Sequence, residues 1–167
     1  MEFTRPGLEI EGFVGFNPVD QLRSAKCSSV PRDSAGVYVV LVPPCMDIAF
    51  LPRSPAGHFK NQDPTVSVST LRARWVHGVS VIYIGRASKT RSTNLRKRIH
   101  TFLKFGGGEN VGHRGGRFVW QIADSDRFLI GWKPCAESRK LEADMLSDFE
   151  RQYGRLPFAN LKRESGD

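Results

Sequence analysis

The helix predicted for residues 92–106 carries a charge on its apolar face. Its apolar positions recur at helical spacing, at Leu95, Ile99, Phe102 and Leu103. Arg98 lies three residues after Leu95 and four before Phe102, which places it on or beside that stripe. An inward charge is costly unless it is paired or employed in a site. In a cleft, a guanidinium is suited to binding a phosphate through two hydrogen bonds.

The helix predicted for residues 137–153 carries a negative charge on its apolar face. Glu142 precedes Met145 and Leu146 by three and four residues, so it faces their apolar stripe. A carboxylate in a cleft can hold a hard cation such as Mg²⁺. Arg98 and Glu142 therefore allow two interpretations. They form a buried ion pair that fixes helix packing, or they bind a phosphate and a cation in a cleft.

Basic residues are concentrated in the second half of the chain. The 167 residues carry a net charge of +8, and the segment from Arg86 to Lys104 holds seven basic residues and no acidic one. Such a field attracts polyanions, although a charge run is also typical of a solvated helix face. We expect these residues to contact nucleic acid: Arg86, Lys89, Arg91, Arg96, Lys97, Arg114 and Arg117.

The composition is that of a globular protein of one domain. No stretch approaches the roughly 18 apolar residues of a membrane span, and the N-terminus lacks a signal pattern, so we expect no membrane contact. The three cysteines include no Cys-x-x-Cys pair, which argues against structural zinc and a disulfide framework. Reduced thiols are typical of a cytoplasmic protein.

The order of apolar runs and turn signals predicts an α/β (α+β) fold. We expect strands at 36–42, 79–85 and 127–133, weaker strands at 8–14 and 65–76, and helices at 92–106 and 137–153. Ser92 and Thr93 are the expected N-caps of the first helix. The run 118–122 is too short to distinguish a strand from a helix. Five prolines within 43–65 indicate a surface loop.

Five short motifs follow one another along the chain. They are Gly36-Val37-Tyr38, Tyr83-Ile84-Gly85, Asn94-Leu95-Arg96-Lys97-Arg98, Leu141-Glu142-Ala143-Asp144-Met145-Leu146 and Pro157-Phe158-Ala159-Asn160. Together, and in this order, they resemble the GIY-YIG nuclease superfamily, with Val37 in place of the usual Ile. Each tripeptide alone is weak evidence, whereas chance does not account for all five. The resemblance covers about residues 35–162.

The resemblance implies a small mixed three-stranded sheet flanked by helices. Residues 35–162 would form this nuclease-like domain, with 1–34 as an N-terminal extension packed on it and 163–167 as a tail. The two halves of the signature usually follow one another across a short turn, but here an insertion at 43–78 separates them. That insertion could extend the sheet, contact DNA or form a subunit interface. The oligomeric state, monomer or homodimer, is left open.

The resemblance also implies a metal-dependent endonuclease that hydrolyses DNA phosphodiester bonds at a single active site. The catalytic residues would be Tyr38, Tyr83, Arg98 and Glu142, and the supporting residues Gly36, Gly85, Arg86 and Asn160. Glu142 is expected to hold Mg²⁺ or Mn²⁺ and Arg98 to clamp the scissile phosphate. Either tyrosine could orient or deprotonate water, Tyr38 being preferred, if cations lower its pKa from near 10. The Asn160 amide is expected to tie the C-terminal loop to the active-site strands.

A further departure from the family pattern, at Phe102, limits this mechanism. Some members place a histidine one turn after the catalytic arginine, whereas Phe102 stands there in this chain, so we do not expect a histidine-assisted reaction. His113 has no second His or Cys at ligand spacing and is not expected to bind metal. The alternative function is a catalytically silent nucleic-acid-binding module of the same fold. The enzyme hypothesis requires Glu142 to lie near Arg98 and both tyrosines and to be reachable by solvent.

Overall fold

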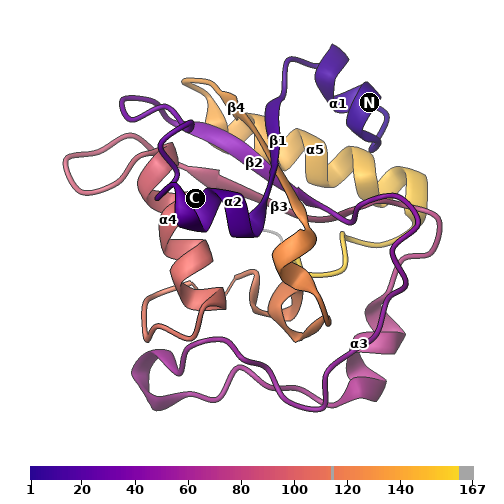
Figure 1. The fold of residues 1–167 in the computed structure, drawn as a ribbon. Coiled ribbons are helices and arrows are strands. Elements are labelled where there is room, and N and C mark those ends of the chain that lie inside the picture. Colours follow the sequence, from indigo (N-terminus) through magenta and orange to yellow (C-terminus); the bar gives the residue numbers. More distant parts are fainter. Residues whose placement is uncertain (114, 162–167) are drawn as a thin grey trace.

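The computed structural model describes residues 1–113 and 115–161, and its centre is a four-stranded antiparallel sheet with the order β1-β4-β2-β3 (Figure 1). The strands are β1 (Val14–Pro18), β2 (Gly36–Leu41), β3 (Val81–Ala87) and β4 (Leu129–Pro134). The helices are α1 (Arg5–Ile10), α2 (Val19–Ser24), α3 (Val68–Arg74), α4 (Leu95–Gly106) and α5 (Ser138–Tyr153), with short 3₁₀ turns at Phe59–Asn61, Arg117–Gln121 and Ser125–Arg127.

The α+β class is confirmed, but the expected sheet was wrong in two respects. It has four strands in place of three, because β1 of the N-terminal extension pairs with the edge of β4. Its pairings are all antiparallel rather than mixed. The added strand satisfies the backbone groups that β4 would otherwise leave unpaired. The predicted tail at 163–167 lies outside the described residues.

The strand β2 is buried on both sides, and its side chains alternate between two apolar layers. Tyr38 and Val40 belong to the layer that includes Phe102 of α4. Val37 and Val39 belong to the layer that includes Phe149 of α5. The helices α4 and α5 therefore cover opposite faces of the sheet (Figure 1).

The three main strands and the two long helices were predicted correctly, with small shifts at their ends. Both the first and the last residue of each strand lie within two residues of the predicted bounds. The helix α4 begins later than expected, because the side chain of Asn94, and not that of Ser92 or Thr93, accepts a hydrogen bond from the Lys97 amide. Gly154, in the left-handed conformation, ends α5 as its position predicted.

Both weaker strand predictions were wrong, because capping residues begin helices in those segments. The side chain of Thr4 accepts from the Gly7 amide and begins α1, so the strand follows at Val14–Pro18 and not at 8–14. The side chain of Ser67 accepts from the Thr70 amide and begins α3 within 65–76. The undecided run 118–122 falls in the 3₁₀ turn Arg117–Gln121.

The insertion at 43–78 does not extend the sheet in the described structure. It contributes the helix α3 and a long loop, drawn along the bottom of Figure 1. The buried side chain of Gln121 fixes this loop, since it donates to the carbonyls of Leu51 and Val66 and accepts from the Val66 amide. The guanidinium of Arg74 donates to the carbonyls of Phe158 and Asn160. The insertion is thus anchored at Leu51 and Val66 to the 3₁₀ turn Arg117–Gln121, and at Arg74 to the segment that carries the last motif.

None of the helices in the described residues has the length and apolarity needed to cross a bilayer.

Candidate active site

The two halves of the signature meet directly across β2 and β3. Tyr38 is the cross-strand partner of Gly85. A Cβ atom built on Gly85 would lie 2.6 Å from Cζ of Tyr38 and 2.8 Å from its hydroxyl oxygen. Gly85 therefore provides the space in which the Tyr38 ring lies.

The two tyrosines form one aromatic group with Phe102 of α4. The Tyr38 and Tyr83 rings contact edge to face at 5.9 Å, and the Tyr83 ring stacks on Phe102 at 5.6 Å. Gly116 lies over this group, since a Cβ atom there would be 2.9 Å from Phe102 and 3.2 Å from Tyr83. The glycine-rich loop after α4 thus covers the tyrosine pair, and the solvent-exposed fractions are 0% for Tyr38 and 5% for Tyr83.

His113 reaches this group from the glycine-rich loop. Its Nε2 atom lies 2.8 Å from the Tyr38 hydroxyl, and its ring centroid is 4.8 Å from that of Phe102. The side chain is 1% exposed, and its Nδ1 atom is buried without a hydrogen-bond partner among the described residues. From the sequence, His113 was considered only as a metal ligand, and its contact with Tyr38 was not predicted. The spacing of apolar residues does not predict where a loop side chain lies. The glycines next to His113 were the one sequence signal that this loop could pack closely against other residues.

Burial and nearby charges shift the titration of both partners. Burial raises the pKa of Tyr38 well above its ordinary value of 10.0, Tyr83 and Glu142 raise it further, and Arg98 lowers it. Burial lowers the pKa of His113 from 6.5 to about 3, and Arg98 acts in the same direction. His113 is therefore neutral near pH 7. The expectation that nearby cations would lower the pKa of Tyr38 is not met, because burial outweighs Arg98.

Glu142 forms an ion pair with Arg86 and not with Arg98, its expected partner in the structural interpretation. Arg86 Nε lies 3.0 Å from Glu142 Oε2, and the side chains are 24% and 8% exposed. Arg98 is half-buried, and its guanidinium makes no hydrogen bond or ion pair with the described residues. The inward position predicted for Glu142 is thus correct, but its partner lies on β3.

The predicted site residues lie on two faces of the sheet. Tyr38 and Tyr83 pack in the layer of α4, whereas Arg86 turns to α5, where it meets Glu142. The two sides are coupled electrostatically, since both Arg98 and Glu142 act on the pKa of Tyr38. The expected open hollow around all four residues is not formed by the described residues, because Tyr38, Tyr83 and Glu142 are buried.

Glu142 offers one carboxylate to a metal ion, which is enough to hold a hard cation weakly. No cluster of three or more His, Cys, Asp or Glu side chains suited to a metal occurs among the described residues. A single carboxylate suffices for Mg²⁺ only where water and substrate phosphate supply the other oxygens. Arg86 competes with a cation for the same carboxylate, so metal binding requires the two to share it.

Two of the expected supporting residues, Asn160 and Gly36, determine how the backbone packs near the tyrosines. The amide of Asn160 donates to the Ile84 carbonyl at 2.7 Å and accepts from the Ile84 N–H at 3.0 Å. This is the tie between the C-terminal loop and the strand that was expected of it. Gly36 permits close approach of β4, since a Cβ atom there would lie 2.5 Å from the Lys133 carbonyl oxygen.

The residues expected to bind nucleic acid are dispersed. Arg86 pairs with Glu142, and the Arg117 guanidinium lies 5.0 Å over the Phe118 ring. Arg96 and Lys97 border a polar hollow on the other side of α4. Lys89 lines a separate cavity, Arg91 is exposed, and Arg114 lies outside the described residues.

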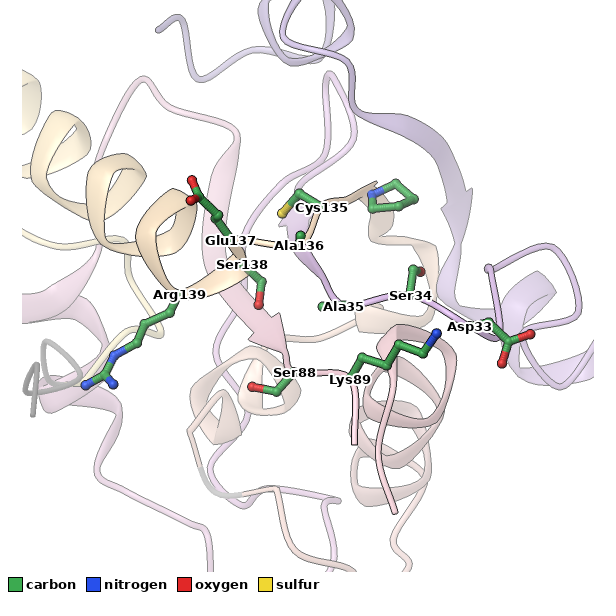
Figure 2. Close-up of a pocket in the computed structure, with 11 residues that line it drawn as sticks. Asp33, Ser34, Ala35, Ser88, Lys89, Cys135, Ala136, Glu137, Ser138 and Arg139 are labelled. Carbon is green, nitrogen blue, oxygen red and sulfur yellow. The ribbon is translucent and has the colours of Figure 1, made fainter. Parts of the chain in front are cut away.

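The cavity that Lys89 lines, of about 650 Å³, lies where β2 begins and β3 and β4 end (Figure 2). Its lining carries both signs of charge. Figure 2 shows the Glu137 and Arg139 side chains pointing away from one another. The hydroxyl of Ser138 is already bonded to the Ala87 carbonyl at 3.0 Å. The described residues that line this cavity include no convergent set of catalytic groups, and neither Tyr38 nor Tyr83 is among them.

Comparison of the chain with protein-family models, curated proteins and solved structures finds no match. Any assignment of function therefore depends on the motif residues and on the geometry described above.

Proposed function

We propose that this protein is a metal-dependent endonuclease of the GIY-YIG type that hydrolyses DNA phosphodiester bonds. The observation that supports this proposal most is the direct pairing of the two signature motifs, in which the Tyr38 ring lies on Gly85. Arg98 and Glu142, from the next two motifs, both act electrostatically on that tyrosine. The fifth motif adds Asn160, which holds the backbone of Ile84 between Tyr83 and Gly85.

Tyr83 is the better candidate for the group that orients or deprotonates the attacking water. The hydroxyl of Tyr38 is engaged with His113 and sealed from solvent, and its pKa is raised by burial. A base needs a pKa near the operating pH, so these shifts disfavour Tyr38. We therefore assign this role to Tyr83 and not to Tyr38, which the sequence had favoured. Tyr38 and His113 hold the Tyr83 ring in place, and Arg98 binds the phosphate whose charge increases during attack.

Glu142 would hold the divalent cation, with Arg86 as its partner in the absence of DNA. When bound, Mg²⁺ or Mn²⁺ supplies polarisation of the phosphate and stabilisation of the leaving oxygen. Because the protein contributes one carboxylate, we expect weak metal binding before DNA provides further oxygens.

The alternative, a silent nucleic-acid-binding module, is favoured by one specific observation. Three of the four proposed catalytic side chains are buried, Glu142 with 6% of its surface exposed, which falls short of the solvent access that the enzyme hypothesis requires. Glu142 also has an ion-pair partner in Arg86 and not in Arg98. Residues in such positions can serve packing and nothing else. In that case the protein would bind DNA through its basic surface and leave it intact.

Cleavage of a panel of duplex, branched and single-stranded DNA in the presence of Mg²⁺ or Mn²⁺ distinguishes the two functions. The endonuclease proposal expects nicking or cutting of at least one substrate, and loss of that activity in Glu142→Gln with DNA binding retained. Binding without cleavage of any substrate by the unmodified protein supports the silent module. RNA substrates of the same forms complete the panel.

A further inference from the structure

The polar hollow that Arg96 and Lys97 border lies between the first turns of α4 and the segment 25–32 that follows α2. Its volume is about 370 Å³. Basic side chains dominate its lining, namely Lys26, Arg32, Arg96, Lys97 and His100. We propose that this basic pocket binds a phosphate of the nucleic-acid backbone, an inference that rests on the proposed function for the identity of the polyanion.

The pocket concentrates positive charge without a counter-charge of its own. None of the described residues that line it is acidic. Lys26 and Arg32 are exposed and form no ion pair with the described residues. Like charges gathered in one place repel each other, and a bound anion relieves that repulsion. Two of the cations come from the N-terminal extension, so the extension takes part in the proposed interface.

The arrangement is pre-formed by Arg96. Its Nε atom donates to the Val30 carbonyl at 2.5 Å, and its Nη2 atom donates to the Ser28 carbonyl at 2.7 Å. These bonds tie the segment that carries Lys26 and Arg32 to α4. A ligand therefore does not have to order this loop on binding, which reduces the entropic cost of association.

The pocket relies on side chains and not on the end of the helix. The side chain of Asn94 already accepts a hydrogen bond from the Lys97 amide at the N-terminus of α4. The cations that line the pocket supply donors that suit phosphate oxygens, and arginine suits them especially well. A site built of long cationic side chains binds a backbone phosphate without reading the base sequence.

The position of the pocket relates it to the candidate active site. Arg96 and Arg98 are two residues apart, so at about 100° per residue their side chains leave α4 in nearly opposite directions. Arg98 acts on Tyr38 and His113, while Arg96 lines the pocket. The helix is about 10–12 Å wide. A nucleic-acid backbone that crosses the N-terminal end of α4 would thus contact Arg98 on one side of the helix and the basic pocket on the other.

The test is the salt dependence of DNA binding by the double variant Lys26→Gln/Arg32→Gln. Fluorescence anisotropy with a short labelled duplex measures affinity at several salt concentrations. We expect about tenfold weaker binding at low salt, and a log–log salt slope smaller by about 0.9 for each phosphate that the variant no longer neutralises. The matched control is Lys60→Gln/Arg72→Gln, which removes two exposed charges from the insertion. Lys60 shares the left-handed backbone of Lys26, with φ of 53° and 48°.

Each outcome decides the proposal. An equal loss in both double variants would show a general charge effect and overturn it, as would unchanged binding in Lys26→Gln/Arg32→Gln. Absence of nucleic-acid binding by the unmodified protein overturns it too. Amide chemical shifts around Lys26 and Lys97 that respond to inorganic phosphate but not to duplex would assign the pocket to a free phosphate compound and overturn the nucleic-acid assignment. If the protein binds DNA through the pocket but cuts nothing, this inference stands and the endonuclease proposal fails.

Discussion

The hydroxyl of Tyr38 lies 2.8 Å from Nε2 of His113, in a contact that joins the first signature strand to the glycine-rich loop. Phe102 occupies the helical position where some members of the GIY-YIG superfamily, which the motifs resemble, have a histidine, and the His113 ring packs against this phenylalanine at 4.8 Å. A histidine thus reaches the tyrosine pair from a different segment. Since its pKa is lowered to about 3 by burial, it acts near neutral pH as an uncharged hydrogen-bonding group.

The first prediction separates the two tyrosines. Tyr83→Phe should lower the single-turnover cleavage rate by roughly 10²–10⁴-fold, the usual contribution of a positioned acid or base. Tyr38→Phe should have a smaller effect, because its hydroxyl contacts His113 and not solvent. The measurement uses saturating DNA, so that binding does not limit the rate. A larger loss in Tyr38→Phe would restore Tyr38 as the base.

The second prediction concerns Glu142. Glu142→Gln should abolish cleavage, retain DNA binding and lower the free energy of unfolding by about 1–3 kcal/mol, since it removes the carboxylate from the ion pair with the Arg86 guanidinium. A fully buried pair would cost about 3–5 kcal/mol, and the 24% exposure of Arg86 reduces that figure.

The control is Asp144→Asn on the exposed side of α5. Asp144 forms an exposed pair with Lys140, so its loss should change the free energy of unfolding by no more than about 0.5 kcal/mol. Chemical denaturation and a filter-binding assay measure both variants. Cleavage by Glu142→Gln at the rate of the unmodified protein would remove this residue from the active site.

Patterns that repeat along one element predicted this structure well. The apolar runs located β2, β3 and β4, and helical spacing located α4 and α5, because both signals depend on residues close in sequence. The inward position of Glu142 followed from the same spacing. Caps were harder to place. Thr4 and Ser67 each bond a nearby amide, and this local contact made a helix where the side-chain types indicated a strand.

Contacts between distant segments do not follow from local spacing. The contact of His113 with Tyr38, 75 residues away, was missed. The bond of Asn160 to Ile84, 76 residues away, was expected only from the resemblance. The predicted ion-pair partner of Glu142, Arg98, was wrong for a related reason. Helical spacing gives the face of Arg98 on α4 but not the side of the sheet on which α4 packs. Arg86 lies on the strand between the two helices, and it takes the place that was expected for Arg98.

The third prediction tests the pairing of the two signature motifs. Gly85→Ala should destabilise the fold by about 1–3 kcal/mol, because its Cβ atom would lie 2.6 Å from Cζ of Tyr38 in a packed layer. Tyr38→Leu in the same chain should recover part of that loss, and the double-mutant cycle measures the coupling. Gly107→Ala is the control, since its Cβ atom would meet nothing nearer than 3.4 Å. Equal losses in both single variants would contradict the proposed steric role.

The fourth prediction concerns stability against pH. The pKa of His113 is about 3 in the folded protein against 6.5 without burial, so below about pH 6.5 the unfolded chain binds a proton that the folded chain does not. Stability from this residue is therefore complete above pH 6.5 and is lost towards pH 3, by about 1.4 kcal/mol per pH unit. Carboxylates titrate in the same range, so the informative quantity is the difference in slope between the unmodified protein and His113→Gln.

That difference isolates one buried imidazole. Urea denaturation at several values between pH 4 and pH 7 should give a shallower dependence for His113→Gln, by close to one proton, although this variant is less stable overall because Tyr38 loses its partner. His77→Gln removes an exposed histidine and should keep the slope of the unmodified protein. Parallel curves for His113→Gln and the unmodified protein would mean that His113 is protonated in the folded state. In that case the imidazole would carry a positive charge next to Tyr38, and that charge would lower the pKa of the phenol and return Tyr38 to the role of base.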